Sequence, residues 1–242
     1  MSLTDKVFAA EGRWLMGKVA PRKLLDSIGS HLRAVAPGRE EELVAAIGSR
    51  AEELAKGDQD MLVDGPAKGM LATCSVVLAG YEILLPEFDG DERRTILFLQ
   101  HIFGEAYRRS IEVVIEALTK GDTPLDTVAK AMEKSSAMYG SYFRFDFERP
   151  DDDTFEMGVT RCFFHDFFAR HDAPLVTTVL CAWDANWMQA LDPGVTGLRS
   201  ERTSLLSLGD DACRFRVVRT DDPLAAQEDV LAERFAGPAQ GG

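Results

Sequence analysis

The spacing of apolar residues divides the chain into two parts. As far as residue 139, apolar residues recur at intervals of three and four, which is the period of an amphipathic helix. Helices are expected at 24–35, 43–54, 71–85, 96–118 and 128–138. The dipeptide Thr123-Pro124 supports the last of these, because threonine caps helices and proline suits their first turn. The first part of the chain is therefore predicted to be helical.

Beyond Gly140 the pattern changes to alternation. In YFRFDFER, at 142–149, aromatic residues alternate with charged ones, which is typical of a half-buried strand. Strands are expected at 142–149, 154–160, 197–208 and 212–219, and helices at 161–170 and 174–191. This β-β-α-α-β-β order predicts an α+β fold, in which a small antiparallel sheet carries the two helices on one face, behind the helical amino-terminal half.

The chain is accordingly predicted to have three regions. Residues 1–139 form a helical region, 140–220 an α+β domain, and 221–242 an acidic tail that is expected to be flexible. The apolar helix faces of the first region could cover a pocket as a lid, or they could form the interface of a homodimer. The spacing fits both alternatives.

Composition and charge narrow the class of protein. The chain has 242 residues, 45% of them hydrophobic, and a formal net charge of −13. Such an acidic chain is a poor partner for nucleic acid or an anionic membrane, because both require a basic face. No secretory signal is evident, so we expect a cytoplasmic protein with free thiols. The longest apolar stretch, 69–85, contains Glu82 and is predicted to be a buried helix, not a membrane span.

Thiols and carboxylates gather among bulky apolar residues in the second half of the chain. Cys162 and His165 are three residues apart on one predicted helix. Cys181 and Asp184 are three apart on the next, so each pair shares a helix face. Cys213 lies on the last predicted strand. We expect the three thiols to converge on one pocket beside Asp184.

Ordinary structural roles have to be weighed against this site. Buried cysteine behaves as a small apolar residue, and that is the role expected for Cys74 in its apolar helix. Asp184 lies between apolar neighbours, where an unpaired carboxylate would be costly. Its candidate partners are Arg161, Arg199 and Arg202.

A zinc site is a further alternative. Cysteine, histidine and aspartate are zinc ligands, but the sequence has no closely spaced pair of cysteines. Zinc is therefore less favoured, and no cofactor is expected. His171, between the two predicted helices, is expected to be a surface residue.

Five short motifs follow one another in the second half of the chain. They are VTRCFF at 159–164, HDAPL at 171–175, CAWD at 181–184, RSERT at 199–203 and GDDACRFR at 209–216. Together they resemble the L-2-amino-thiazoline-4-carboxylic acid hydrolases, mainly over 140–220 and more loosely upstream. The layout is also similar to vinyl-reductase-type domains, which bind small molecules. The resemblance implies a hydrolase that opens a five-membered C=N ring, converting 2-aminothiazoline-4-carboxylate to N-carbamoyl-cysteine.

The residues can be given roles in that chemistry. The ring carbon between nitrogen and sulfur is an electrophile, open to attack by a thiolate or by an activated water. Cys162 is the first candidate nucleophile, because it lies at a predicted helix start beside Arg161. Asp184 is expected to act as a base or to bind the cationic amidine. The candidate catalytic residues are Cys162, Asp184, Cys181, Cys213 and His165. The candidate substrate-binding residues are Arg161, Arg202 and Asp211, the arginines as holders of a substrate carboxylate.

Other functions fit the same residues. One is a non-catalytic module that senses a small molecule or a metal through the same pocket. Another is a cyclase or lyase in a biosynthetic pathway, which would close such a ring. All of these functions imply a small-molecule partner.

Overall fold

Helices fill the first part of the chain, as the apolar spacing predicts. The structure is a computed structural model that describes residues 20–236. Its long helices here are α2 (Ala20–Val35), α3 (Glu40–Gly57), α4 (Gly65–Leu84), α5 (Glu92–Thr119) and α6 (Pro124–Ser136). Short 3₁₀ helices follow α3, α4 and α6: η2 (Gln59–Met61), η3 (Leu85–Phe88) and η4 (Ala137–Tyr139). The five helical predictions are confirmed, and α6 begins at the proline that the sequence marks as its first turn.

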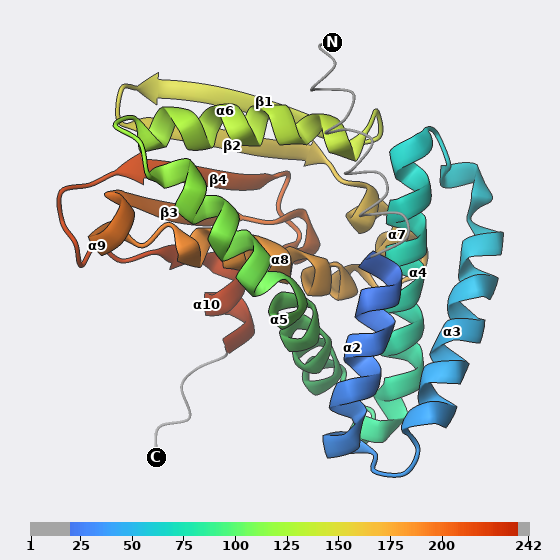
Figure 1. Ribbon diagram of the computed structural model, residues 1–242. Coiled ribbons are helices and arrows are strands. Elements are labelled where there is room, and N and C mark those ends of the chain that lie inside the picture. Colours follow the sequence, from blue (N-terminus) through green and yellow to red (C-terminus); the bar gives the residue numbers. More distant parts are fainter. Residues whose placement is uncertain (1–19, 237–242) are drawn as a thin grey trace.

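Helix α4 is the buried member of this helical layer. Helices α2, α3 and α4 lie side by side, and α5 runs from them toward the sheet (Figure 1). The stretch Gly65–Phe88 is long and apolar enough to cross a membrane by length and composition. However, 67% of its most apolar window is buried inside the protein, as is typical of a core helix. Cys74 has no exposed surface, which confirms its packing role.

The second part of the chain forms a five-stranded mixed sheet. Its strands are β1 (Arg144–Asp151), β2 (Thr154–Arg161), β3 (Leu198–Ser204), β4 (Cys213–Arg219) and β5 (Glu228–Asp229), in the spatial order β1-β2-β4-β3-β5. All neighbours are antiparallel except β3 and β5. The α+β class is confirmed, but the sheet is not purely antiparallel. The strand expected at 197–208 also ends early, because 206–208 form the 3₁₀ helix η6 (Leu206–Leu208).

The fifth strand comes from the segment that was predicted to be a flexible tail. There β5 leads into α10 (Val230–Ala236), whose Val230 and Leu231 are buried. These residues pack against the rest of the sheet's core. Residues 1–19 and 237–242, which belong to the predicted helical region and tail, lie outside the described residues.

The two helices between β2 and β3 pack differently. They are α7 (Phe163–Arg170) and α8 (Thr177–Ala190), with η5 (Pro174–Val176) before α8 and α9 (Pro193–Thr196) after it. Helix α8 packs on β3, as predicted, and along α5. Helix α7 packs on α4 instead, because Phe163, Phe167 and Phe168 are buried among the helices. Helix α6 contacts β2 and β4 and covers part of the sheet (Figure 1).

Two hydrophobic clusters result, and both cross the predicted boundary at residue 139. The helical cluster joins buried residues of α2 to α5 with those of α7 and the start of α8. The sheet cluster joins buried residues of α6, β2 to β4 and α10 with the ends of α5 and α8. The helical layer and the sheet are therefore tied together by shared cores.

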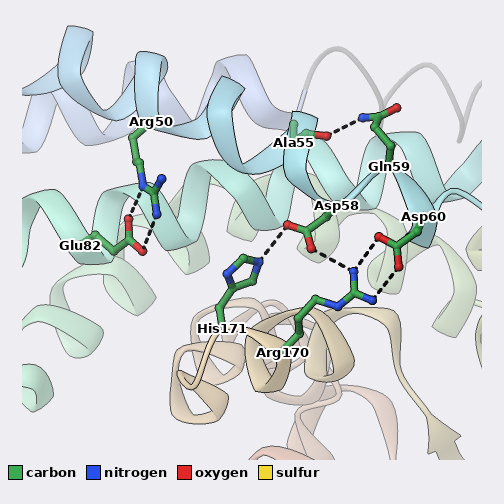
Figure 2. A network of polar contacts seen from close by, with 8 residues as sticks. All are labelled: Arg50, Ala55, Asp58, Gln59, Asp60, Glu82, Arg170 and His171. Carbon is green, nitrogen blue, oxygen red and sulfur yellow. Dashed lines mark hydrogen bonds and ion pairs between the residues drawn. The ribbon is translucent and has the colours of Figure 1, made fainter.

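A network of charged groups fixes α7 to the helical layer (Figure 2). Arg170 Nη1 donates to Asp58 Oδ1 at 3.0 Å, and the same guanidinium donates to both oxygens of Asp60. His171 Nε2 lies 2.9 Å from Asp58 Oδ2. The Asp58 side chain is only 6% exposed, so its two partners compensate a buried carboxylate. His171, which was expected to be a surface residue, is partly exposed, at 24%, and its ring is bound to Asp58.

We expect Asp58→Ala to weaken this connection. The substitution leaves His171 without its carboxylate partner, and it removes one of the two anions that hold Arg170. The free energy of unfolding should fall by about 1–3 kcal/mol. Urea unfolding measures the change, and Glu42→Ala, at an exposed ion pair with Arg39, is the matched control that should change little. An equal effect of the two substitutions would contradict a structural role for the buried carboxylate.

Candidate active site

Three thiols from separate elements meet in the sheet cluster. Cys162 is the residue before α7, Cys181 lies on α8, and Cys213 begins β4. The η6 turn holds two of them: the Leu206 amide donates to Cys213 Sγ at 3.5 Å, and Ser207 Oγ lies 3.9 Å from Cys181 Sγ. All three belong to or pack against the same cluster. The three thiols therefore share one cluster, and their convergence on a pocket beside Asp184 stays a prediction.

Burial keeps these thiols protonated. It raises the pKa of Cys162 well above its ordinary value, although the backbone amides of His165 and Phe164 act in the opposite direction. Burial likewise raises the pKa of Cys181. It raises the pKa of Cys213 to about 11. A thiolate is the reactive form of cysteine, so the geometry disfavours a cysteine nucleophile at neutral pH.

Arg161 does not lie beside Cys162 as the sequence suggests. Its guanidinium is 4.1 Å from the centre of the Tyr142 ring and 3.8 Å from Asp166, on a half-exposed side chain. The Tyr142 hydroxyl donates to the same Asp166 at 3.1 Å. Arg161 therefore belongs to a separate polar group at the surface. The backbone is still extended at Cys162, and successive side chains of an extended backbone point to opposite faces.

Two further predicted residues have different surroundings from those expected. The Asp211 side chain is 81% exposed and pairs with Arg214 at 3.1 Å, so it does not line the thiol site. His165 has a buried Nδ1 without a hydrogen-bond partner among residues 20–236. The structure connects His165 to Cys162 through its backbone amide.

Asp184 is the carboxylate whose charge acts on two of the thiols, Cys181 and Cys213. Its side chain is 26% exposed, Trp187 Nε1 donates to it at 3.2 Å, and Arg202 Nη1 is 3.8 Å away. Burial raises the pKa of Asp184, Arg202 and Trp187 oppose that shift, and the negative charge of Asp229 adds to it. Of the three predicted arginine partners, Arg202 is the one that Asp184 has. A partly exposed carboxylate with a raised pKa is suited to accept a proton.

Arg202 is held on all sides. Its side chain has no exposed surface. Nε and Nη2 each donate to an oxygen of Asp229 at 2.7 Å, and Nη1 donates to the Cys181 carbonyl at 2.8 Å. These contacts occupy the guanidinium edge that was expected to hold a substrate carboxylate. The structure assigns Arg202 to the support of Asp184 and α8.

Tyr139 packs against the phenylalanines around β1, and sequence reasoning did not single it out. It ends η4, and its ring packs 4.9 Å from that of Phe143 and 5.5 Å from that of Phe145, between ring centres. Burial raises the pKa of Tyr139, and negative charge on Asp184 or Cys162 acts in the same direction. In the sequence Tyr139 is only the last residue before a glycine, and no spacing rule connects it with residues 162 and 184.

The described residues offer no evident metal centre. Within residues 20–236, no group of three histidine, cysteine, aspartate or glutamate side chains has an arrangement that could hold a metal ion. The four cysteines, all within that range, are free thiols.

Comparison with known protein families identifies the family of the chain. Residues 76–217, more than half of the chain, match the family model of L-2-amino-thiazoline-4-carboxylic acid hydrolase. The chain belongs to this family. The match confirms the resemblance and extends it upstream from residue 140 into α4, so it includes Tyr139 as well as the thiols and Asp184. The name of the L-2-amino-thiazoline-4-carboxylic acid hydrolase family implies hydrolase activity. A comparison with curated proteins gives no match.

The thiol pKa shifts make a prediction about reactivity. We expect every cysteine of the native protein to react slowly with an alkylating reagent at neutral pH, because burial disfavours the thiolate. The rate should rise toward pH 11 for Cys213. Mass spectrometry after timed alkylation assigns each site, and protein unfolded in urea gives the unprotected rate. A fast-reacting Cys162 at neutral pH would restore the cysteine nucleophile.

The support of Arg202 can be tested at Asp229. In Asp229→Asn the buried guanidinium loses its charged partner, so we expect the free energy of unfolding to fall by about 3 kcal/mol. Urea unfolding gives the value. Glu228→Gln is the matched control. The neighbouring Glu228 side chain is exposed, and its one ion pair, with Arg199, is long at 3.8 Å. Similar stabilities for the two variants would mean that Asp229 does not carry the buried charge.

Proposed function

We propose that the protein is a hydrolase that opens a small ring containing a C=N bond, with Asp184 as the base that activates water. 2-Aminothiazoline-4-carboxylate, the compound in the family's name, is the substrate to test first. The single observation that carries the proposal is the position of Asp184 in a chain of this family: its side chain is 26% exposed, and its charge acts on the Cys181 and Cys213 thiols.

The charge of the site fits a cationic amidine. Arg202 compensates part of the Asp184 charge, but it donates chiefly to Asp229 and lies 3.8 Å from Asp184. The carboxylate therefore retains the capacity to accept a hydrogen bond from a ring nitrogen. Trp183 and the phenylalanines of β1 pack against the sheet cluster, so a small planar ring would lie among apolar groups. Such surroundings strengthen the attraction between a carboxylate and a protonated amidine.

The reaction then needs one water and one acid–base group. Asp184 accepts a proton from water as the water oxygen bonds to the ring carbon, and the C=N electron pair moves to the ring nitrogen. The ring carbon becomes tetrahedral. When its carbon–sulfur bond breaks, both electrons stay on sulfur, and Asp184 returns the proton to it. The new hydroxyl releases its proton to solvent and becomes the carbonyl oxygen, which balances the proton of the amidinium that entered.

The thiols have a supporting part in this scheme. Protonated, they are weak hydrogen-bond donors and polarizable groups, and they add no negative charge near Asp184. A negative thiolate next to that carboxylate would disfavour the ionised form of both groups. The water-based route therefore agrees with the raised pKa values of Cys162 and Cys181 better than the thiolate route does.

The proposal predicts a specific loss of activity. The wild-type protein should release one thiol for each thiazoline ring that it opens, and Asp184→Asn should lower kcat by about 10²–10⁴. Timed titration of the released thiol measures the rate, with mass spectrometry to identify the product. Asp211→Asn, at an exposed carboxylate, is the matched control and should keep full activity.

The pH dependence of activity gives a second test of Asp184. Because the pKa of Asp184 is raised by burial, wild-type activity should fall as the pH drops through a value above that of an ordinary aspartate. Burial penalises the ionised carboxylate, so Asp184→Asn should fold with no loss of stability at neutral pH, as urea unfolding can show. Full activity of a folded Asp184→Asn protein would overturn the assignment of the base.

A further inference from the structure

The indole of Trp187 lies one helical turn after Asp184 on α8. Its Nε1 donates to Asp184 Oδ1 at 3.2 Å, and the residue is only 4% exposed. A buried indole N–H needs an acceptor, because it donates a hydrogen bond and cannot accept one. Trp187 and Asp184 therefore form a pair in which one carboxylate oxygen is bound before any substrate arrives.

Contacts with two other elements hold the indole in this position. The Trp187 ring packs against that of Phe215 on β4, with 5.7 Å between the ring centres. The preceding residue, Asn186, is buried, and its Nδ2 donates to the Gly104 carbonyl of α5 at 3.0 Å. Helix α8 is thus fixed to α5 on one side and to the sheet on the other, so the indole N–H has little freedom to turn away from Asp184.

The second oxygen of Asp184, Oδ2, has different surroundings. Among residues 20–236 it has no hydrogen-bond partner, and Arg202 Nη1 lies 3.8 Å from it, beyond hydrogen-bond distance. The Arg202 guanidinium donates instead to Asp229 at 2.7 Å and to the Cys181 carbonyl at 2.8 Å. Because Asp229 compensates the charge of Arg202, this cation opposes a proton on Oδ2 only in part. Oδ2 is therefore the oxygen of Asp184 that is free to take up a proton.

We infer that Trp187 is the positioning residue of Asp184: its indole N–H holds Oδ1, so that the base takes up and returns its proton at Oδ2. The inference rests on the proposed hydrolase function and names the atom at which its acid–base chemistry occurs. As water attacks the ring carbon, an O–H bond of the water breaks and the Oδ2–H bond forms. When the carbon–sulfur bond breaks, the Oδ2–H bond breaks in turn and the proton passes to sulfur.

The chemistry of the indole favours this assignment. Its N–H needs an acceptor whether Asp184 is ionised or protonated. If Oδ2 carries the proton, Oδ1 becomes the carbonyl oxygen of the acid and remains a good acceptor. If Oδ1 carried the proton, the indole would face a hydroxyl oxygen, which is a poorer acceptor than a carbonyl oxygen. The same hydrogen bond thus persists through the reaction, and the carboxylate takes and returns the proton without rotating.

Kinetics of matched variants tests the positioning role. Site-specific replacement of Trp187 by benzothienylalanine keeps the size of the ring but puts sulfur in place of the N–H. It should lower kcat for thiazoline opening by about 10–10² and leave KM within a few-fold, since the carboxylate becomes free to turn. Trp187→Phe should lower kcat at least as much. Tyr142→Phe is the control, because it removes another aromatic donor to an aspartate, the 3.1 Å bond to Asp166, and should change neither constant.

The pH profile separates this role from a loss of packing. Without the indole N–H the ionised carboxylate loses a donor, so the fall of activity at acid pH should begin about 0.5–1 pH unit higher in the benzothienylalanine protein. The replacement keeps the other groups that are coupled to Asp184 by charge, which are Arg202, Asp229, Cys181, Cys213 and Tyr139. Wild-type kcat and pH profile in that protein, with Asp184→Asn inactive, would overturn the inference and leave the proposed function standing.

Infrared spectroscopy tests the protonated atom without any substrate. The chain has 40 acidic side chains, so spectra that span the titration of Asp184 are compared between wild type and Asp184→Asn, and their difference contains the C=O band of protonated Asp184. In the benzothienylalanine protein this band should move to higher wavenumber, because the carbonyl oxygen Oδ1 loses its hydrogen bond. A band that does not move would refute the assignment of the proton to Oδ2. If wild-type protein opens no thiazoline ring, the proposed function fails and the catalytic role of Trp187 fails with it, whereas the band still decides which oxygen holds the proton.

Discussion

The buried guanidinium of Arg202 is the constraint on which the candidate site depends. A cation without exposed surface is tolerated only where anions and carbonyls surround it, because its desolvation costs several kcal/mol. Asp229 supplies two short hydrogen bonds, and the Cys181 carbonyl supplies a third. Arg202 lies on β3, Asp229 on β5 and Cys181 on α8. The buried charge therefore depends on the return of the chain after β4, which adds β5 beside β3. Asp184 lies beside this centre and owes part of its ionisation to it.

The site combines groups that oppose one another. Burial raises the pKa of Asp184 and of the thiols, whereas Arg202 lowers that of Asp184. A carboxylate in this balance is easier to protonate than one in water and still able to ionise, which a base that takes and returns a proton requires. The balance has a cost in stability, because a carboxylate in these surroundings costs more to ionise than one in water. Sites that retain such groups are common places of function.

The sequence predicted what short-range spacing controls and missed what distant contacts control. Helices and strands followed from periods of 3.6 and 2, and the pairing of Cys181 with Asp184 on one helix face followed from the same rule. Arg161 and Asp211 have other partners than the sequence suggested, because adjacency in sequence does not show which way a side chain turns. Tyr139 and Asp229 had no local signal. Each is placed by contacts with residues that are far away in the chain.

The amino-terminal helices hold the elements around the candidate site at two points, and these contacts argue against the role of a lid. Asp58, at the end of α3, binds the residues that end α7, while Asp64 binds the turn that leads into β1. A lid has to separate from the site when it opens, and separation here would break a buried carboxylate's contacts and expose the helical cluster that α7 shares with α4. The helices α3 and α4 are therefore better described as a frame. They fix two segments of the chain, one before Cys162 and one after it.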